Sequence, residues 1–218
     1  MAIKVFISKG SATTTKQREF IDGVLHTLDV SGLSPRIMFE NEWSHEQPLT
    51  AIKKVIKECS GAVIIAFERT IIKEGFELKK DGKEDLANTT LPTPWNQIEA
   101  AMAYSYGLPL LVIAENGLKS EGLIEQGYDW NVYWTELSVE AAKSESFKGF
   151  LNSWKKSVVE FHSRPSKELS DPGKLTVAQL LRVMNIPQLW SLFAAIVSLL
   201  IAVATFAYKT GAGKWPWG

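Results

Sequence analysis

A glutamate, Glu99, follows Trp95 by four residues in a segment whose apolar spacing predicts a helix over residues 93–106. Four residues make about one helical turn, so the two side chains are adjacent. A carboxylate beside a bound sugar can stabilise an oxocarbenium ion or attack the anomeric carbon, as in glycosidic cleavage. Glu99 is therefore a candidate catalytic residue, with Trp95 and Asn96 as candidate ligand contacts. A solvated helix glutamate fits the same spacing.

A second group of candidates lies just after the first apolar run of the chain. Ser8, Lys9, Gly10 and Ser11 offer hydroxyls, a lysine and free backbone N–H groups before a predicted helix. Such a loop suits a phosphate or a ribose. It lacks the glycine spacing of a Walker motif, and an ordinary capped turn is the alternative.

Three further side chains complete the candidate ligand site. Arg69 can bind phosphate, although a surface ion pair would explain it equally, and Trp43 and Trp95 can stack on a base. The three histidines and the single cysteine have no metal-ligand spacing, so we expect no metal. We expect no bound cofactor; NAD or a nucleotide-derived signal would be the ligand or substrate.

The elements that must position these residues alternate along the chain. Short apolar runs predict strands, and helical spacing predicts the segments between them. The predicted strands are residues 3–7, 35–39, 61–67, 108–114 and 129–137, and the predicted helices are 16–28, 48–59, 93–106 and 147–162.

This alternation indicates an α/β fold, a flavodoxin-like or Rossmann-like parallel sheet covered by helices on both faces. In such sheets ligands bind beyond the carboxyl ends of the strands. The strand ends here include both candidate groups. Residues 68–92 form a long polar connection, which is typical of either a functional lid or a disordered loop.

Composition narrows the function classes. Lys+Arg and Asp+Glu both number 24, so the formal net charge is zero and no basic excess indicates a nucleic-acid partner. Apolar residues make up 45% of the 218, an ordinary value for a folded protein. One cysteine permits no disulfide within the chain, which fits a reducing compartment. The first residues do not have the pattern of a signal peptide.

The end of the chain carries a long uncharged run. Residues 189–208 have about the length that a helix needs to cross hydrocarbon, with Trp190 and Tyr208 at its ends. The flanking positive charges favour a cytoplasmic N-terminal side. We therefore predict a single-pass protein of the inner (cytoplasmic) membrane with its folded domain in the cytoplasm and membrane lipid as a partner. A buried core helix is the alternative.

These predictions divide the chain into five parts. They are an α/β domain at 1–140, a helix packing on it at 141–163, a juxtamembrane linker at 164–185, a transmembrane helix at 186–208 and a short tail at 209–218. Small residues also recur on one face of the last helix, where they would let copies approach closely and form a homo-oligomer, or they recur by chance. These small residues are Ser191, Ala195, Ser198, Ala202 and Thr205.

Several short motifs resemble known families. Lys4–Ser8 (KVFIS) resembles the opening strand of TIR domains, and the spacing from Trp95 to Glu99 is similar to that of the TIR helix carrying the catalytic glutamate of NAD-cleaving members. Residues 100–109 (AAMAYSYGLP) are similar to a stretch of nucleoside 2-deoxyribosyltransferases that follows their nucleophilic glutamate. The resemblance covers roughly residues 1–137.

The resemblance implies a TIR-like sheet, cleavage of N-glycosidic bonds and a catalytic role for Glu99. The chain departs from these families in residues 40–48, in the long segment after the third strand, and at Thr93, near the place of an expected aspartate. These departures fit a pocket that binds a nucleotide without cleaving it.

Three functions follow from the resemblance. The first is a membrane-anchored, oligomerising anti-phage effector that binds NAD or a related nucleotide and, as an NAD glycohydrolase, cleaves it. The second is a non-enzymatic nucleotide sensor whose transmembrane helices assemble to disrupt the membrane. The third is a TIR-like scaffold or adaptor.

Overall fold

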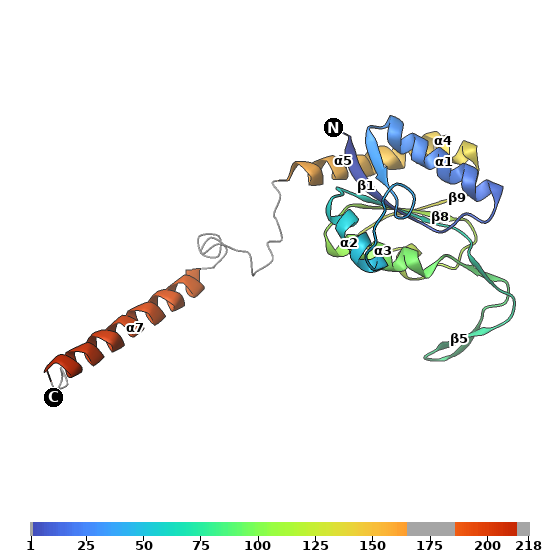
Figure 1. Cartoon of the computed structure of the whole chain (residues 1–218). Coiled ribbons are helices and arrows are strands. Elements are labelled where there is room, and N and C mark those ends of the chain that lie inside the picture. Colours follow the sequence, from blue (N-terminus) through green and yellow to red (C-terminus); the bar gives the residue numbers. More distant parts are fainter. Residues whose placement is uncertain (1, 165–185, 213–218) are drawn as a thin grey trace. The chain divides into compact units, whose positions relative to one another are not determined.

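The computed structural model describes residues 2–164 and 186–212. The described residues fall into two units, one ending at Arg164 and one following it. The first unit is an α/β sandwich around a five-stranded sheet of strand order β2-β1-β3-β8-β9 (Figure 1). All neighbouring strands in this sheet are parallel. The strands are β1 (Ile3–Lys9), β2 (Leu33–Arg36), β3 (Ala62–Ala66), β8 (Leu110–Glu115) and β9 (Val132–Thr135).

Helices cover both faces of this sheet (Figure 1). On one face lie α1 (Thr15–Val30), α4 (Val139–Lys143) and α5 (Glu145–Ser163). On the other lie α2 (Pro48–Lys57), α3 (Pro94–Ser105) and the short 3-10 helix η1 (Gly122–Ile124). The α/β class and the parallel sheet predicted from the sequence are confirmed. The second strand begins earlier than predicted and ends at Arg36, before a turn.

The sheet lies at the core of the unit. Successive residues of a strand face opposite sides of the sheet, so each strand packs with helices on both faces. In β1, Val5 and Ile7 pack with α1 and α5, whereas Phe6 packs with α2 and α3. The next residue on the Phe6 side is Ser8, which is 1% exposed. A hydroxyl therefore takes the place of an apolar side chain at the carboxyl end of the central strand.

The helices next to the site begin at clear caps. Thr14 caps α1 through a capping box with Gln17, and the Gln17 amide also donates to the backbone oxygen of Glu68 at 3.1 Å. Thr93 caps α3 by accepting from the Trp95 N–H, and Pro94 fills the first helical turn. These caps fix both helix N-termini at the carboxyl ends of the strands.

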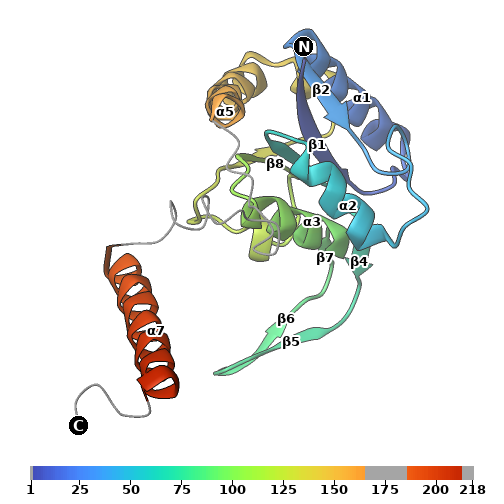
Figure 2. The ribbon, with the colours of Figure 1, turned by 60° about the vertical axis from the view of Figure 1, so that its left-hand side comes forward.

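Residues 68–92, for which the sequence predicted either a functional lid or a disordered loop, form an arm of two antiparallel strand pairs, so this segment is not a disordered loop. Its strands are β4 (Thr70–Ile72), β5 (Phe76–Lys79), β6 (Gly82–Asp85) and β7 (Thr89–Leu91). β4 pairs with β7, and β5 pairs with β6, both antiparallel. Figure 2 shows the β5–β6 hairpin projecting from the sheet unit.

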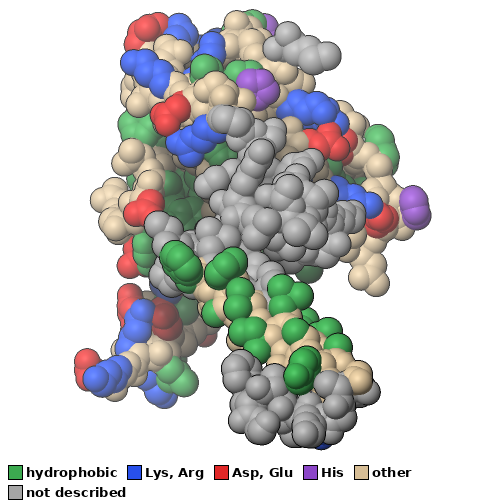
Figure 3. All heavy atoms as spheres, turned by 90° about the vertical axis from the view of Figure 1, so that its left-hand side faces the viewer, with side chains coloured by type: hydrophobic (Ala, Val, Ile, Leu, Met, Phe, Trp, Pro, Cys, Tyr) green, Lys and Arg blue, Asp and Glu red, His purple; other side chains and the backbone are tan. Residues whose placement is uncertain are grey.

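The second unit contains helix α7 (Ile186–Ala212), which starts where the transmembrane helix was predicted and runs past its end. Apolar side chains such as Leu199, Val203 and Phe206 are exposed along it (Figure 3). The predicted linker at 164–185 lies, beyond Arg164, outside the described residues. Of the predicted tail, residues 213–218 lie outside them as well.

The membrane prediction needs correction. Within residues 2–164 and 186–212, no helix combines the length and the sustained hydropathy that crossing a bilayer requires. The prediction rested on the absence of charged residues, and the absence of charge does not by itself show that a helix can cross a bilayer. The prediction of a single-pass inner-membrane protein is therefore wrong for the part of the chain that the structure describes.

Candidate functional site

The sheet reverses its direction of winding between β1 and β3. From β1 the chain crosses to β2 on one side, whereas from β3 it crosses to β8 and β9 on the other. The two flanking connections therefore part at the carboxyl ends of β1 and β3, leaving a crevice there. This switch point is where α/β sheets of this kind bind ligands.

A cavity of about 560 Å³ occupies this place. Its volume lies within the range of roughly 300–1,000 Å³ that is usual for small-molecule sites. The wall combines apolar side chains with two carboxylates and two cations. It is formed by Ile7, Lys9, Gly10, Ser11, Ile37, Met38, Phe39, Glu40, Pro48, Ile52, Arg69, Thr93, Trp95 and Glu99.

Glu99 is the buried carboxyl group of this cavity. Its residue is only 9% exposed, whereas Trp95 and Ile98 on the same helix are 46% and 41% exposed. Burial raises the pKa of Glu99 from 4.5 to about 7, and a hydrogen bond from Ser8 opposes part of that rise. Glu99 can therefore hold or release a proton near neutral pH, as a group that takes part in acid–base or nucleophilic catalysis needs to do.

A buried pair of polar side chains stands behind Glu99. The Asn96 Nδ2 donates to the Ser8 Oγ at 2.9 Å, and both residues are 1% exposed. Because the Ser8 hydroxyl accepts this bond, its own proton is directed to the Glu99 carboxylate. The Asn96 Oδ1 is buried without a hydrogen-bond partner among the described residues. The Ser8 hydroxyl thus favours the ionised form of Glu99, and Asn96 holds the Ser8 oxygen.

The two cations of the cavity come from the ends of β1 and β3. The Lys9 side chain is 11% exposed, and its Nζ lies 2.5 Å from the Glu40 Oε1. Arg69 is exposed, and its backbone N–H donates to the Leu91 oxygen at 2.9 Å. A phosphate entering the cavity would meet Arg69 directly and would compete with Glu40 for Lys9.

Aromatic side chains border the cavity. Phe39 and Trp95 are 48% and 46% exposed, so part of each ring is available to a ligand. Phe39 has a φ of 61°, a conformation that non-glycine residues rarely adopt. The turn is held by Asn41, whose Oδ1 accepts from the Ile37 N–H at 2.7 Å and whose Nδ2 donates to the Pro35 oxygen. Backbone strain of this kind is common at ligand sites.

Gly10 lets the loop after β1 pass close to its neighbours. A Cβ at this position would lie 3.2 Å from the Phe67 ring and 3.5 Å from the Thr93 methyl group. A larger residue would push the loop away from β3, and with it the Ser11 side of the cavity. The glycine therefore contributes by close packing rather than by an unusual backbone angle.

The structure brings most of the predicted site residues together. Five of them line the cavity with Glu99, while Ser8 and Asn96 lie directly behind its carboxyl group. The five lining residues are Lys9, Gly10, Ser11, Arg69 and Trp95. Trp43 does not join them: it is 76% exposed and lies outside the cavity lining.

Sequence reasoning missed several residues of the wall. Phe39 and Glu40 follow β2, and Thr93 was identified from the sequence only as a departure from the families that the chain resembles. Their place after a strand or before a helix was a usable signal, because every strand end on this edge approaches the same crevice. Nothing in their types pointed to a ligand.

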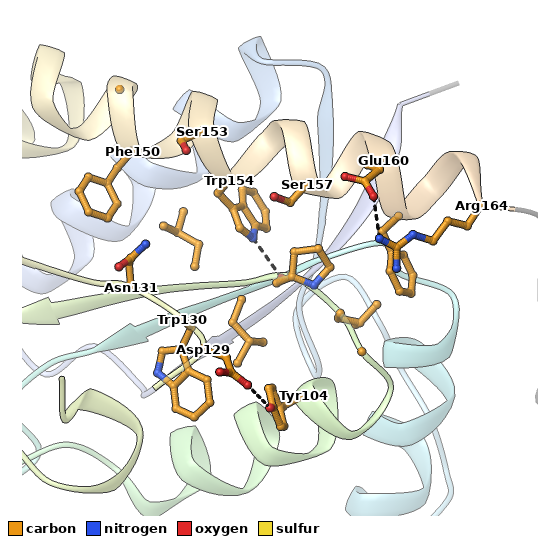
Figure 4. Close-up of a pocket in the computed structure, with 17 residues that line it drawn as sticks. Tyr104, Asp129, Trp130, Asn131, Phe150, Ser153, Trp154, Ser157, Glu160 and Arg164 are labelled. Atoms are coloured by element: carbon orange, nitrogen blue, oxygen red, sulfur yellow. Dashed lines mark hydrogen bonds and ion pairs between the residues drawn. The ribbon is translucent and has the colours of Figure 1, made fainter. Parts of the chain in front are cut away.

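A second cavity of about 640 Å³ lies at the opposite, amino ends of β8 and β9, against α5 (Figure 4). Its two carboxylates are already engaged. Asp129 accepts from the Tyr104 hydroxyl at 2.6 Å, and Glu160 pairs with Arg164 at 2.8 Å. We therefore assign the candidate site to the smaller cavity, which contains the buried Glu99. Among the described residues, no cluster of three His, Cys, Asp or Glu residues is arranged to hold a metal ion.

No protein-family model matches the chain, and no curated protein matches it either. Solved structures with a similar arrangement include a CMP N-glycosidase, BcmB, from Clostridium botulinum. It is 18% identical with a TM-score of 0.41, and the match covers 68% of this chain and 98% of BcmB. Another is the TIR domains of the activated Roq1 resistosome that recognises the pathogen effector XopQ. That match has 11% identity, a TM-score of 0.35 and coverage of 83% of this chain and 98% of the other.

Proposed function

We propose that the chain hydrolyses the N-glycosidic bond of a nucleotide, either NAD or a related nucleotide, with Glu99 as the catalytic residue. The observation that supports this most is the burial of the Glu99 carboxyl group in the wall of a cavity at the switch point of the sheet. The similarity of the spacing from Trp95 to Glu99 to the TIR pattern agrees with it.

The chemistry assigns a role to each part of the wall. The ionised Glu99 carboxylate faces C1′ of the ribose and stabilises the positive charge that develops as the C1′–N bond breaks. The base leaves with the electron pair of that bond, and the oxygen of a water molecule adds to C1′. The water proton passes to Glu99 or to the leaving base.

The remaining groups bind and orient the nucleotide. Lys9 and Arg69 provide positive charge for phosphate, and the loop at Gly10 and Ser11 lies before the N-terminus of α1. The rings of Phe39 and Trp95 offer faces for a base. The cavity thus provides for each of the three parts of a nucleotide.

The test uses the purified full chain with NAD, CMP and AMP as separate substrates, and free base is measured by chromatography. Glu99→Gln should lower the rate about 10²–10⁴-fold, because it removes the charge but keeps the size of the side chain. Glu19→Gln, on the exposed face of α1, is the matched control and should keep the wild-type rate.

Binding of the same nucleotides to the wild-type chain and to Glu99→Gln is measured by calorimetry. An enzyme keeps most of its affinity in Glu99→Gln while losing the rate. If nucleotides bind but no base is released by the wild type, the pocket is a nucleotide sensor. If none of the three binds, a nucleotide function for this cavity is wrong. The role in anti-phage defence stays a prediction from the TIR resemblance.

A further inference from the structure

The arm formed by β4, β5, β6 and β7 is anchored at its base and free at its tip. Thr90 in β7 donates its hydroxyl to the Gly117 oxygen, and its own oxygen accepts from the Lys119 N–H at 2.9 Å. The Lys119 ammonium also binds Glu77 in β5. Beyond this anchor the hairpin of β5 and β6 extends outward (Figure 2). A two-stranded hairpin without further packing is only marginally stable.

The outer hairpin exposes two apolar side chains of β5 on one face, opposite the charged residues Lys83 and Asp85 of β6. Phe76 and Leu78 alternate with Glu77 and Lys79 along β5, so they lie on the same face. Phe76 is 67% exposed and Leu78 is 77% exposed. On the other face, Glu77 binds Lys79 and Lys119. Phe76 and Leu78 therefore stay largely exposed, with the Lys83 ammonium 5.9 Å from the centre of the Phe76 ring, while Glu77 turns to the anchor.

We propose that β5 pairs antiparallel with β5 of a second copy of this chain, about a twofold axis at Leu78. The four strands would form one sheet of order β6-β5-β5-β6. Leu78 would pair with Leu78 of the second copy, with the two Phe76 rings on the same face. This surface goes beyond the nucleotide chemistry and does not depend on it.

The hydrogen-bonding groups of β5 permit this pairing. Lys79 pairs with Gly82 across a two-residue turn, and such a turn is closed by a hydrogen-bonded pair. Hydrogen-bonded and non-hydrogen-bonded pairs then alternate, so the inward bonds fall on odd-numbered residues of the strand. The bond from the Leu86 N–H to the Gly75 oxygen at 2.9 Å follows this alternation. The N–H and C=O of Phe76 and Leu78 therefore point to the free edge.

The unpaired N–H and C=O groups of β5 allow several registers, and the charges of Glu77 and Lys79 favour one of them. Pairing Phe76 with Leu78 of the second copy would oppose Glu77 to Glu77. Pairing Leu78 with Lys80 would oppose Lys79 to Lys79. Pairing Leu78 with Leu78 instead opposes Glu77 to Lys79 on both sides of the axis. Like charges that face each other directly destabilise a strand pair, and opposite charges stabilise it.

The other edge of the hairpin does not offer such a register. Self-pairing of β6 centred on Lys83, Glu84 or Asp85 places each of these charges opposite itself. The charged β6 edge is protected against pairing in the way that natural edge strands usually are. β5 is therefore the edge that accepts a second copy.

Site-specific cross-linking of the full chain tests this register. The chain has one cysteine, Cys59, which is buried and whose thiol pKa is raised to about 12, so it does not compete. Leu78→Cys should give a disulfide-linked dimer under mild oxidation, because the two Cα atoms lie about 5.5 Å apart in a hydrogen-bonded pair.

Phe76→Cys is the matched control. In the proposed register its two copies are four residues out of step, roughly 13 Å along the strand, which is too far for a disulfide. A several-fold excess of dimer for Leu78→Cys over Phe76→Cys supports the pairing. Absence of dimer for Leu78→Cys, or equal dimer for both variants, overturns it. This comparison also separates β5 pairing from association through the exposed apolar side chains of α7, which would not depend on register.

Charge variants of the full chain give a second, independent measurement. Glu77→Lys alone opposes lysine to lysine, and Lys79→Glu alone opposes glutamate to glutamate. Combined with Leu78→Cys, each should lose the homodimer cross-link. A mixture of the two should restore it as a heterodimer, which mass spectrometry identifies. Failure of the mixture to cross-link while Leu78→Cys alone does so would show that Glu77 and Lys79 do not set the register.

Discussion

The buried Glu99 carboxyl group makes the candidate site sensitive to pH. Its pKa of about 7 means that the ionised form, which stabilises the developing charge at C1′, is populated above neutrality. Base release by the wild type should therefore rise as pH increases through about 7 and level off above it. At this residue, the hydrogen bond from Ser8 limits how far burial raises the pKa of Glu99.

Removing the Ser8 hydroxyl should raise the pKa of Glu99 further. The Ser8 hydrogen bond stabilises the carboxylate, so Ser8→Ala leaves burial as the main influence on this group. The midpoint of the rate against pH should move upward by roughly half to one unit. A pH–rate profile of Ser8→Ala beside the wild type measures it. An unchanged midpoint together with a lower rate at every pH would indicate a purely structural role.

The same burial makes Glu99 costly for stability. The folded state has the higher pKa, so between pH 4.5 and about 7 it binds more protons than the unfolded state. Stability supplied by the protonated form is therefore lost as pH rises through 7, an effect of at most about 3 kcal/mol.

Glu99→Gln removes this loss, because the amide does not ionise. The variant should unfold at a higher temperature than the wild type at pH 8, with a much smaller difference at pH 5. Thermal unfolding by circular dichroism at the two pH values measures both. A difference that is the same at pH 5 and pH 8 would contradict the raised pKa.

Among the elements, α5 is held against the sheet by a close approach at the start of β3. A Cβ at Gly61 would lie 2.6 Å from the Val158 Cγ2 and 2.8 Å from the Trp154 ring. Trp154 in turn donates from its indole Nε1 to the Pro109 oxygen at 3.0 Å. The packing of α5 against the sheet thus depends on the absence of a side chain at Gly61. This glycine is not part of the cavity lining.

Gly61→Ala should separate α5 from β3. Overpacking of this kind costs about 1–3 kcal/mol, since Val158 and Trp154 are both largely buried. Urea unfolding followed by tryptophan fluorescence measures the change. Gly149→Ala, in α5 where an added Cβ meets nothing within 4 Å, is the control and should not destabilise the protein. Equal midpoints for the two variants would show that β3 and α5 adjust without cost.

At the scale of the whole molecule, the cavity and the sheet belong to one unit. The three clusters of buried apolar residues lie within the unit that ends at Arg164. The cavity lining and the arm lie in this unit too. Helix α7 lies in the other unit, so the chemistry proposed for Glu99 does not require it.

A chain that ends at Arg164 should therefore fold and keep the activity. Its midpoint of thermal unfolding should stay within a few degrees of that of the full chain, and its rate of base release should be the same within about twofold. Calorimetry and the substrate assay compare the two chains. Loss of folding in the shorter chain would mean that residues after Arg164 complete the core.

Local patterns in the sequence determined the elements that position the site. Alternating apolar runs predicted the parallel sheet, and helical spacing over residues 93–106 predicted the helix that carries Glu99, because periodicity acts within a few residues. The resemblance at Trp95 to Glu99 added a candidate role for the glutamate. The tertiary structure decided the features that depend on contacts between segments distant in the sequence. Burial of Glu99, its contact with Ser8 and the exposure of Trp43 all depend on which strand ends meet.

The long polar segment and the last helix show the same division. Residues 68–92 were predicted as a polar connection because each of their strands has four residues or fewer, too short a run for periodicity to identify, and only pairing across the arm makes them strands. A helix does form where one was predicted at 186–208, and it continues to Ala212, but its prediction as a membrane span was wrong for the described residues. Solvent exposure and strand pairing depend on contacts between segments that are distant in the sequence, and local periodicity does not specify these contacts.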